Sequence, residues 1–468
     1  MKIRERMGIV LVVIGLLWLI VPSLEAAQIT EIKVKCDKGQ SVQSALDSLS
    51  GPAIITVTGI CHENLVIKND DVTLQGGTYD APDSARSTIF VEGARRVAIT
   101  GVTVRGGLAG VRAFQGASLT LENSTIEENE SCGVHAFTGS SVSVDSCTIQ
   151  KNNGQGVIAA DNSNLALTNS TITDNHMAGV LVMGASNARI GKSSQGVLGR
   201  NQITNNWGYG VNVTWSSFAM INGNTLTGNG GYGVNIDAAS AEVINNTIAS
   251  NGCGGIWVAN SGSAMIGLGH LSPSEPNTIE NNQFEGIKIS NGGSAWIFAN
   301  TIQHNGRTGI LIQHATAELL GENTIKANGG HGVQLRQARL FQPVGDLNPV
   351  LRPTDPDVIT ENIYSGIHAS IDASLDIQNA TITYNHENGI LLGLQSTLRI
   401  FNSDASHNEL DGIVLYDGST VARYQFNQPR DTITYNGGYG IAVYGGSNLV
   451  GEKSGVHDNV TGNFNWEE

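Results

Sequence analysis

The chain of 468 residues is poor in charged and aromatic side chains, which make up 14% and 6% of it. Its 26 lysines and arginines stand against 41 aspartates and glutamates, giving a formal net charge of −15, and no basic cluster is present. Nucleic-acid backbones are bound by clustered Lys and Arg, so we expect no nucleic-acid partner. The hydrophobic share of 40% is that of a folded protein.

Long apolar runs are almost absent, and the one present, Gly8–Val21, follows basic residues at the start of the chain. This arrangement predicts a signal peptide over residues 1–26, cleaved after Ala26. An uncleaved anchor is the alternative, but the run is shorter than the roughly 18 to 20 residues of a membrane-spanning helix. We expect a secreted or periplasmic protein with no membrane attachment after cleavage.

Cysteines are few and their number, 5, is odd, so at least one thiol has no intramolecular partner. Cys36 and Cys61 flank the first helix-like segment and are the best candidates for a disulfide in an exported chain. Cys132 and Cys147 can pair only if the turns bring them together. For Cys253 we expect a small buried side chain.

The compact motifs of common enzyme classes are also missing. The sequence has no His-Glu-x-x-His, Cys-x-x-Cys, phosphate-binding loop or Gly-x-Ser-x-Gly. The eleven histidines are scattered and give no set of three metal ligands. We therefore expect no cofactor and no bound metal.

What the chain has instead is a repeat, represented by Asn282 and Gly286 followed by Ile287, Lys288 and Ile289. An Asn stands four residues before a Gly, and apolar, variable and apolar residues follow the Gly. Most steps between these glycines are 23 residues long, which predicts a solenoid. The repeat glycines are Gly110, Gly133, Gly156, Gly179, Gly210, Gly233, Gly255, Gly286, Gly309, Gly332, Gly366, Gly389, Gly412 and Gly440.

Two-residue alternation within the period predicts three short strands per coil, each with one inward face. No coil has room for a helix, so successive coils should stack as parallel sheets around apolar columns. We assign the repeat residues a structural role: a ladder of stacked amides, represented by Asn282, Asn305 and Asn328, and corner glycines that take a positive φ, represented by Gly286, Gly309 and Gly332.

The ends of the chain differ from the repeats. Ser41–Leu49 has the N-cap and apolar stripe of a helix that could cover the first coil. We therefore expect a cap and irregular coils over 27–109, regular coils over 110–450 and a polar tail over 451–468. Four longer coils carry insertions near residues 191–200, 267–276, 342–356 and 424–430. All four begin at about the same distance after the repeat glycine, so they should leave the solenoid at the same corner of the coil. Such insertions mark a binding face or record duplication of a three-coil unit.

The Asn-x-Ile-x-x-Asn-x-x-x-Gly-[Val/Ile] repeat resembles the right-handed parallel β-helix proteins of the pectin-lyase-like superfamily, in particular the NosD-like repeat group. The opening segment, from Cys36 to Cys61 and Asn64, is similar to their N-terminal cap. The resemblance covers roughly residues 30–450. It implies an all-β, single-stranded right-handed parallel β-helix with an N-terminal capping helix. It does not imply one function, since the fold carries lyases, hydrolases, epimerases and inert stalks.

Motifs of two enzyme groups with this fold are missing. The chain lacks the Asp-Pro-His-[Asp/Glu] box of alginate epimerases and the Asn-Thr-Asp, Asp-Asp and Gly-His-Gly set of polygalacturonases. Neither group is favoured.

The outward positions beside the repeat glycines are richest in aromatic and charged residues between Tyr209 and His368. Aromatic rings suit sugar rings, and Lys, Arg and His could neutralise a uronate carboxylate and remove its C5 proton. The candidate catalytic residues are Lys288, Arg336, His331 and His368. The candidate glycan-binding residues are Tyr209, Tyr232, Trp257, Glu285, Arg307 and Tyr364.

Three hypotheses follow for the function. The leading one is an exported, non-catalytic β-helix that binds or scaffolds on polysaccharide or cell-surface glycan. The second is a polysaccharide lyase or epimerase acting on uronate glycans, and the third, from the NosD-like resemblance, is a periplasmic accessory protein for metal-site maturation. The sequence does not indicate an oligomeric state.

Overall fold

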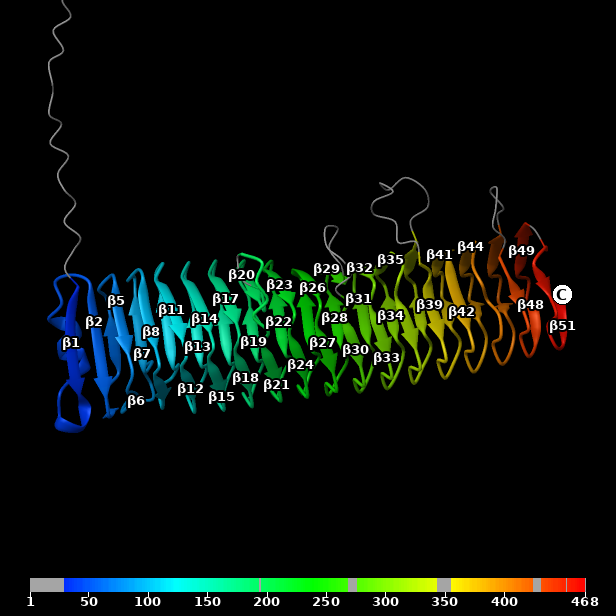
Figure 1. Ribbon diagram of the computed structural model, residues 1–468. Coiled ribbons are helices and arrows are strands. Elements are labelled where there is room, and N and C mark those ends of the chain that lie inside the picture. The colour runs from blue at the N-terminus through cyan, green and yellow to red at the C-terminus, as the bar shows by residue number, and fades with distance from the viewer. Residues whose placement is uncertain are drawn as a thin grey trace, which may run out of the picture.

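The protein is a parallel β-solenoid in which each coil contributes one short strand to each of three sheets (Figure 1). The computed structural model describes residues 29–192, 195–267, 276–342, 355–423, 431–451 and 453–467. The right-handed parallel β-helix predicted from the sequence is confirmed. The expected signal peptide lies outside the described residues.

In the described residues, sheet A contains 18 strands, all paired in parallel. They are β1 (Thr30–Lys35), β2 (Ala53–Thr58), β5 (Val72–Gln75), β8 (Val97–Thr100), β11 (Ser118–Glu122), β14 (Ser141–Asp145), β17 (Asn164–Thr168), β20 (Asn187–Ile190), β23 (Phe218–Asn222), β26 (Ser240–Ile244), β29 (Ser263–Gly267), β32 (Ser294–Phe298), β35 (Thr316–Leu319), β38 (Arg339–Phe341), β41 (Ser374–Gln378), β44 (Thr397–Phe401), β46 (Thr420–Arg423) and β49 (Asn448–Gly451).

Sheet B follows sheet A in each coil. It contains β3 (Ile60–Cys61), β6 (Thr78–Asp80), β9 (Thr103–Arg105), β12 (Thr125–Glu127), β15 (Thr148–Gln150), β18 (Thr171–Thr173), β21 (Gln202–Thr204), β24 (Thr225–Thr227), β27 (Thr247–Ala249), β30 (Thr278–Glu280), β33 (Thr301–Gln303), β36 (Thr324–Lys326), β39 (Asp357–Thr360) and β42 (Ala380–Thr383). A separate pair, β47 (Ile433–Thr434) and β50 (Val456–His457), follows it toward the C-terminus.

Sheet C is formed by the strands that follow the repeat glycines. It contains β4 (Leu65–Ile67), β7 (Ile89–Glu92), β10 (Val111–Phe114), β13 (Val134–Ala136), β16 (Val157–Ala159), β19 (Val180–Val182), β22 (Val211–Thr214), β25 (Val234–Asp237), β28 (Ile256–Ala259), β31 (Ile287–Ser290), β34 (Ile310–Gln313), β37 (Val333–Arg336), β40 (Ile367–Ser370), β43 (Ile390–Gly393), β45 (Ile413–Leu415), β48 (Tyr439–Val443) and β51 (Gly462–Trp466).

The strands pair in register, so equivalent residues of successive coils form columns. Ile287 of β31 pairs with Ile310 of β34, and Ile289 pairs with Ile312. All four side chains are fully buried. Because each strand buries alternate residues, the same pairing fixes which residues face outward.

The predicted asparagine ladder is present at the turn between sheets B and C. Asn282 Nδ2 donates to Asn305 Oδ1 over 2.9 Å, and Asn305 Nδ2 donates to Asn328 Oδ1 over 3.0 Å. Each amide also donates to a main-chain carbonyl, as Asn282 does to Ile248. The ladder therefore satisfies buried polar groups of successive turns.

The repeat glycines are required for a different reason from the one predicted. Gly286 does not have a positive φ. A Cβ placed on it would lie 2.5 Å from Ile302 Cγ2 and 2.7 Å from the carbonyl oxygen of Gly309. Close packing between coils therefore excludes a side chain. The positive φ is taken instead by the residue before each ladder Asn, such as Asn281 at 55° and His304 at 53°.

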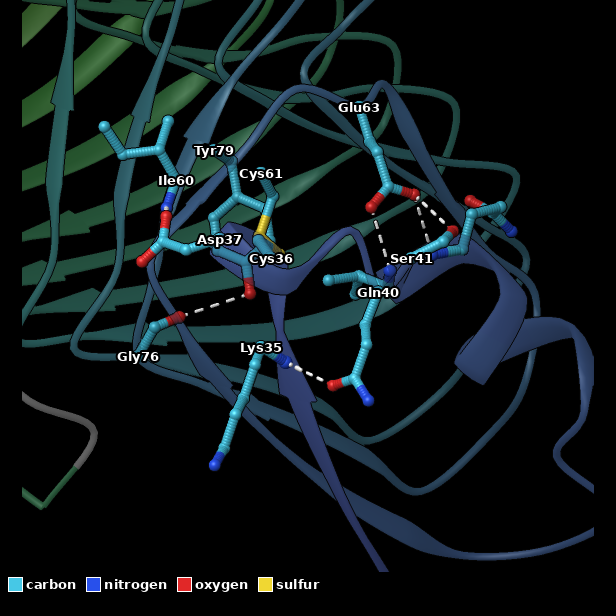
Figure 2. Close-up of a disulfide and its surroundings, with 12 residues drawn as sticks. Lys35, Cys36, Asp37, Gln40, Ser41, Ile60, Cys61, Glu63, Gly76 and Tyr79 are labelled. Atoms are coloured by element: carbon cyan, nitrogen blue, oxygen red, sulfur yellow. Dashed lines mark hydrogen bonds between the residues drawn. A yellow bond between two sulfur atoms is a disulfide. The ribbon is translucent and has the colours of Figure 1, made fainter.

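The N-terminal end is covered by helix α1 (Val42–Asp47), which follows a short 3-10 turn, η1 (Cys36–Lys38). The Ser41 side chain caps α1 by accepting from the Ser44 N–H. Glu63 accepts from the Ser41 hydroxyl and from the first main-chain N–H groups of the helix (Figure 2). Cys36 and Cys61, the pair that the sequence favoured, form a disulfide beside this cap. Cys132, Cys147 and Cys253 are free.

The solenoid continues beyond residue 450, where the sequence suggested a polar tail. Strand β51 pairs in parallel with β48, so the last residues add a further strand to sheet C. The four insertions fall between a strand of sheet A and the next strand after it, as between β29 and β30. Most of their residues lie outside the described ranges. Within those ranges, no helix is long and apolar enough to cross a membrane.

Candidate functional site

The outer face of sheet C carries three of the candidate residues, Trp257, Lys288 and His368, in one column, because the strands stay in register. Trp257 pairs with Lys288, Lys288 with Leu311, and Gln334 with His368. In chain order the column reads Phe90, Arg112, His135, Ile158, Leu181, Asn212, Asn235, Trp257, Lys288, Leu311, Gln334, His368 and Leu391.

The centre of this face holds an aromatic and charged group that we call the Trp257 cluster: Tyr232, Trp257, Glu285, Lys288 and Arg307. The Lys288 Nζ lies 5.3 Å from the Trp257 ring centroid. Glu285 is only 7% exposed, accepts from the Tyr232 hydroxyl at 3.5 Å and faces an Arg307 nitrogen at 3.9 Å. Burial, followed by the Glu285 charge, raises the pKa of Tyr232. The phenol therefore stays protonated and acts as a donor.

Trp257 is held in place from one side. Its Nε1 donates to the Ser290 hydroxyl over 2.9 Å, and its ring lies 5.4 Å from that of Tyr232. Tyr209 belongs to the coil that precedes that of Tyr232, and burial raises the pKa of Tyr209 too. An indole fixed by its polar edge offers a pre-organised apolar surface beside the Lys288 ammonium.

A second group, the histidine pair, lies further along sheet C. The His331 Nε2 and the His368 Nδ1 are 3.1 Å apart, and the exposed Tyr364 ring lies 5.3 Å from that of His331. Burial, and then His368, lowers the pKa of His331 to about 4. Burial, and then the Arg336 charge, lowers that of His368. Both imidazoles are therefore neutral at neutral pH, and His331 Nδ1 and His368 Nε2 are buried without partners.

The four candidate catalytic residues fall in two places. His331, His368 and Arg336 are neighbours, while Lys288 stands in the Trp257 cluster. Lys288 on β31 and His368 on β40 are three strand steps apart, which is roughly 14 Å at ~4.8 Å per step. Of the candidate glycan-binding residues, Tyr364 stands with the histidine pair.

Two groups on the surface were missed by the sequence argument. Arg112 lies among three phenylalanine rings at the N-terminal part of sheet C. The exposed rings of Tyr384, His407 and Tyr435 stack at the turn after sheet B, with centroids 5.2 and 5.1 Å apart. Both groups could have been found in the sequence. Phe114 and Phe137 recur two residues after the outward column of sheet C, and the three stacked rings each stand just before a ladder Asn.

Metal ligands do not gather in the part of the chain that the structure describes. No group of three or more His, Cys, Asp or Glu side chains there could hold an ion.

Solved structures similar to this one include polysaccharide-acting β-helix proteins. The Azotobacter vinelandii mannuronan C-5 epimerase AlgE6 A-module is 14% identical, with 88% of this chain and 94% of that chain covered and a TM-score of 0.38. The periplasmic alginate epimerase AlgG is 15% identical over 80% of this chain and 84% of its own, with a TM-score of 0.34. Pectate lyase Pel9A is 12% identical over 67% and 76%, with a TM-score of 0.28. Likeness at this level carries no argument about activity.

No curated protein matches the sequence. The family model for the right-handed β-helix region matches residues 55–192, 188–269, 272–342 and 356–467, which is most of the chain. Together with the parallel coils described above, this match shows that the chain belongs to the right-handed β-helix family.

Proposed function

We propose that the protein is an exported β-helix that binds polysaccharide or another cell-surface glycan along the outer face of sheet C, without chemical conversion. The Trp257 cluster is the observation that carries this proposal. Its indole is fixed in place, Lys288 stands beside the ring, and Arg307 faces Glu285 in the same cluster. Sugar rings stack on indoles, and their hydroxyls and carboxylates bind to such donors.

The distance of Lys288 from the histidine pair argues against one active site that uses all four candidate catalytic residues. A lyase or epimerase must remove a proton and neutralise a carboxylate on one sugar unit, so the groups must converge within hydrogen-bond reach. Lys288 and His368 are too far apart for this. The buried Glu285 already faces Tyr232 and Arg307.

Export is supported by the apolar N-terminal run and by the Cys36–Cys61 disulfide, which suits an oxidising compartment. Fusing residues 1–28 to a reporter enzyme tests it. The reporter should appear outside the cytoplasm, and retention inside would contradict export.

The test of glycan binding is titration of the full chain with a panel of neutral and acidic oligosaccharides. Trp257→Ala should weaken binding about tenfold or more, because a buried aromatic contact is worth on the order of 1.4 kcal/mol or more. The matched control is Trp296→Ala, since Trp296 is half exposed on sheet A. Equal loss in both variants, or no binding by the wild type, would reject the proposal.

A polysaccharide lyase or epimerase is the second candidate, and the histidine pair favours it. His331 and His368 are neutral bases with buried, unpartnered nitrogens, and Arg336 lies near enough to lower the pKa of His368. Incubation with uronate polysaccharides should then yield unsaturated ends or C5 inversion. Product that disappears in His368→Ala but not in Lys288→Ala would establish this activity and displace the binding-only proposal.

A further inference from the structure

Arg112 has unusual surroundings on the outer face of sheet C. Its guanidinium carbon lies 5.9 Å from the ring centroid of Phe90, 5.8 Å from that of Phe114 and 5.3 Å from that of Phe137. The rings come from successive coils, and those of Phe114 and Phe137 are nearly parallel at 12°. We call these four residues the Arg112 cage.

The charge in this cage has no counterpart in the described part of the protein. No hydrogen bond or ion pair there reaches the Arg112 guanidinium, and its Nε is buried without a partner. Arg105 on sheet B differs from Arg112 in this respect, because it forms an ion pair with Asp80 at 3.3 Å. A half-buried guanidinium that lacks a carboxylate keeps its bidentate donors available for an incoming anion.

The neighbouring groups neither neutralise Arg112 nor add charge to it. Glu92, which pairs in register with Phe114 on the neighbouring strand, forms an ion pair with Lys68 at 3.0 Å. His135 follows Arg112 in the column, and burial, followed by the Arg112 charge, lowers its pKa to about 4. His135 is therefore neutral at neutral pH, which leaves one isolated positive charge among apolar rings.

We propose that the Arg112 cage is an anion subsite that binds the carboxylate of an acidic sugar unit and makes the protein select acidic over neutral polysaccharides. The guanidinium fork takes the carboxylate, and the phenylalanine rings pack against the C–H face of the same sugar. This proposal rests on the glycan binding proposed above and gives it a substrate class.

The cage is separate from the Trp257 cluster. Six strand steps lead from Arg112 on β10 to Trp257 on β28, or roughly 29 Å at ~4.8 Å per step. The column between them is apolar at Ile158 and Leu181 and uncharged at Asn212 and Asn235. A chain lying along sheet C can contact both places, so selectivity and general affinity can be changed independently.

The experiment compares uronate oligosaccharides with their carboxyl-reduced counterparts of equal length, by calorimetric titration of the full chain. The wild type should bind the acidic form at least tenfold more tightly. Arg112→Gln should reduce acidic binding to the level of the reduced form and leave binding of the reduced form unchanged. Arg112→Lys keeps the charge but loses the two-pronged donor geometry, so its affinity for the acidic form should lie between those of the wild type and Arg112→Gln.

The matched control is Arg189→Gln, which removes an exposed arginine from sheet A. It should leave the preference intact, because the effect requires the cage and not net charge. Equal binding of acidic and reduced forms by the wild type would overturn the cage proposal while glycan binding stands. Equal loss in Arg112→Gln and Arg189→Gln would also overturn it. Binding of neither form would reject both proposals. Circular dichroism of each variant checks that the fold is retained.

Discussion

At the scale of single residues, Asp357 replaces an amide in a second ladder, at the turn between sheets A and B. Asn277 donates to Asn300, Asn300 to Asn323, and Asn323 to the Asp357 Oδ1 over 2.8 Å. The other oxygen accepts from Gln342. Asp357 is fully buried, and desolvation raises its pKa to about 6. The run of amides from Asn277 thus ends on a carboxyl group that titrates.

The Asp357 carboxyl should make the fold less stable as pH rises from about 4 to about 6. Over this range the unfolded chain loses the proton while the folded chain keeps it, which favours unfolding; above pH 6 the penalty is constant. A shift from 3.8 to about 6 corresponds to a penalty on the order of 3 kcal/mol. Asp357→Asn should flatten the change, measured by urea unfolding from pH 3.5 to 7. The exposed Asp417→Asn is the control, and an equal effect there would contradict the assignment.

The histidine pair should change the stability of the fold with pH in the opposite direction. The pKa of His331 is lowered to about 4 from 6.5, so the unfolded chain binds a proton first as pH falls, and stability declines between pH 6.5 and 4. His331→Phe keeps a ring against Tyr364 and should lessen this decline, measured by unfolding at pH 7 and 4.5. An unchanged decline would show that His331 is not the neutral buried base described.

At the scale of elements, the ladder at the turn between sheets B and C joins coils through side chains. Asn282 donates to Asn305 and Ile248 and accepts from the N–H and amide of Asn251. Asn282→Ala leaves these buried groups without partners, and each costs about 1 to 3 kcal/mol. We expect a clear fall in unfolding temperature. The neighbouring Gln283 is exposed, so Gln283→Ala should have little effect; equal falls would argue against the ladder.

The sequence was sufficient to predict the strands and their inward faces, because alternation such as Ile287 and Ile289 repeats in register. It did not predict why Gly286 is required, because the contact with Ile302 and Gly309 exists only between stacked coils. The sequence pattern placed Lys288 and His368 on one face, because both occupy the same outward column; strand spacing sets them three steps apart. The Arg112 cage depends on which way the long side chain leans, which periodicity does not specify.

At the scale of the whole molecule, the solenoid has two different ends. The N-terminal end has α1, the Glu63 contacts and the Cys36–Cys61 disulfide, whereas the C-terminal end finishes on β49 and β51 without a described helix (Figure 1). In a solenoid each coil contacts its neighbours, so stability is distributed along the axis and local opening can begin at an end.

Removing the disulfide should therefore lower the local stability of the N-terminal coils and leave that of the central coils unchanged. Cys36→Ser with Cys61→Ser frees a loop closed over 25 residues, a change worth about 3 kcal/mol. Hydrogen exchange should accelerate in β1, β2 and β3 and stay unchanged in β28 and β31, because many coils separate them. Cys253→Ser, which alters a free cysteine, should leave exchange at the N-terminal end unchanged. Faster exchange along the entire chain would show that the coils unfold as one cooperative unit, and that the cap stabilises all of them and not only the first.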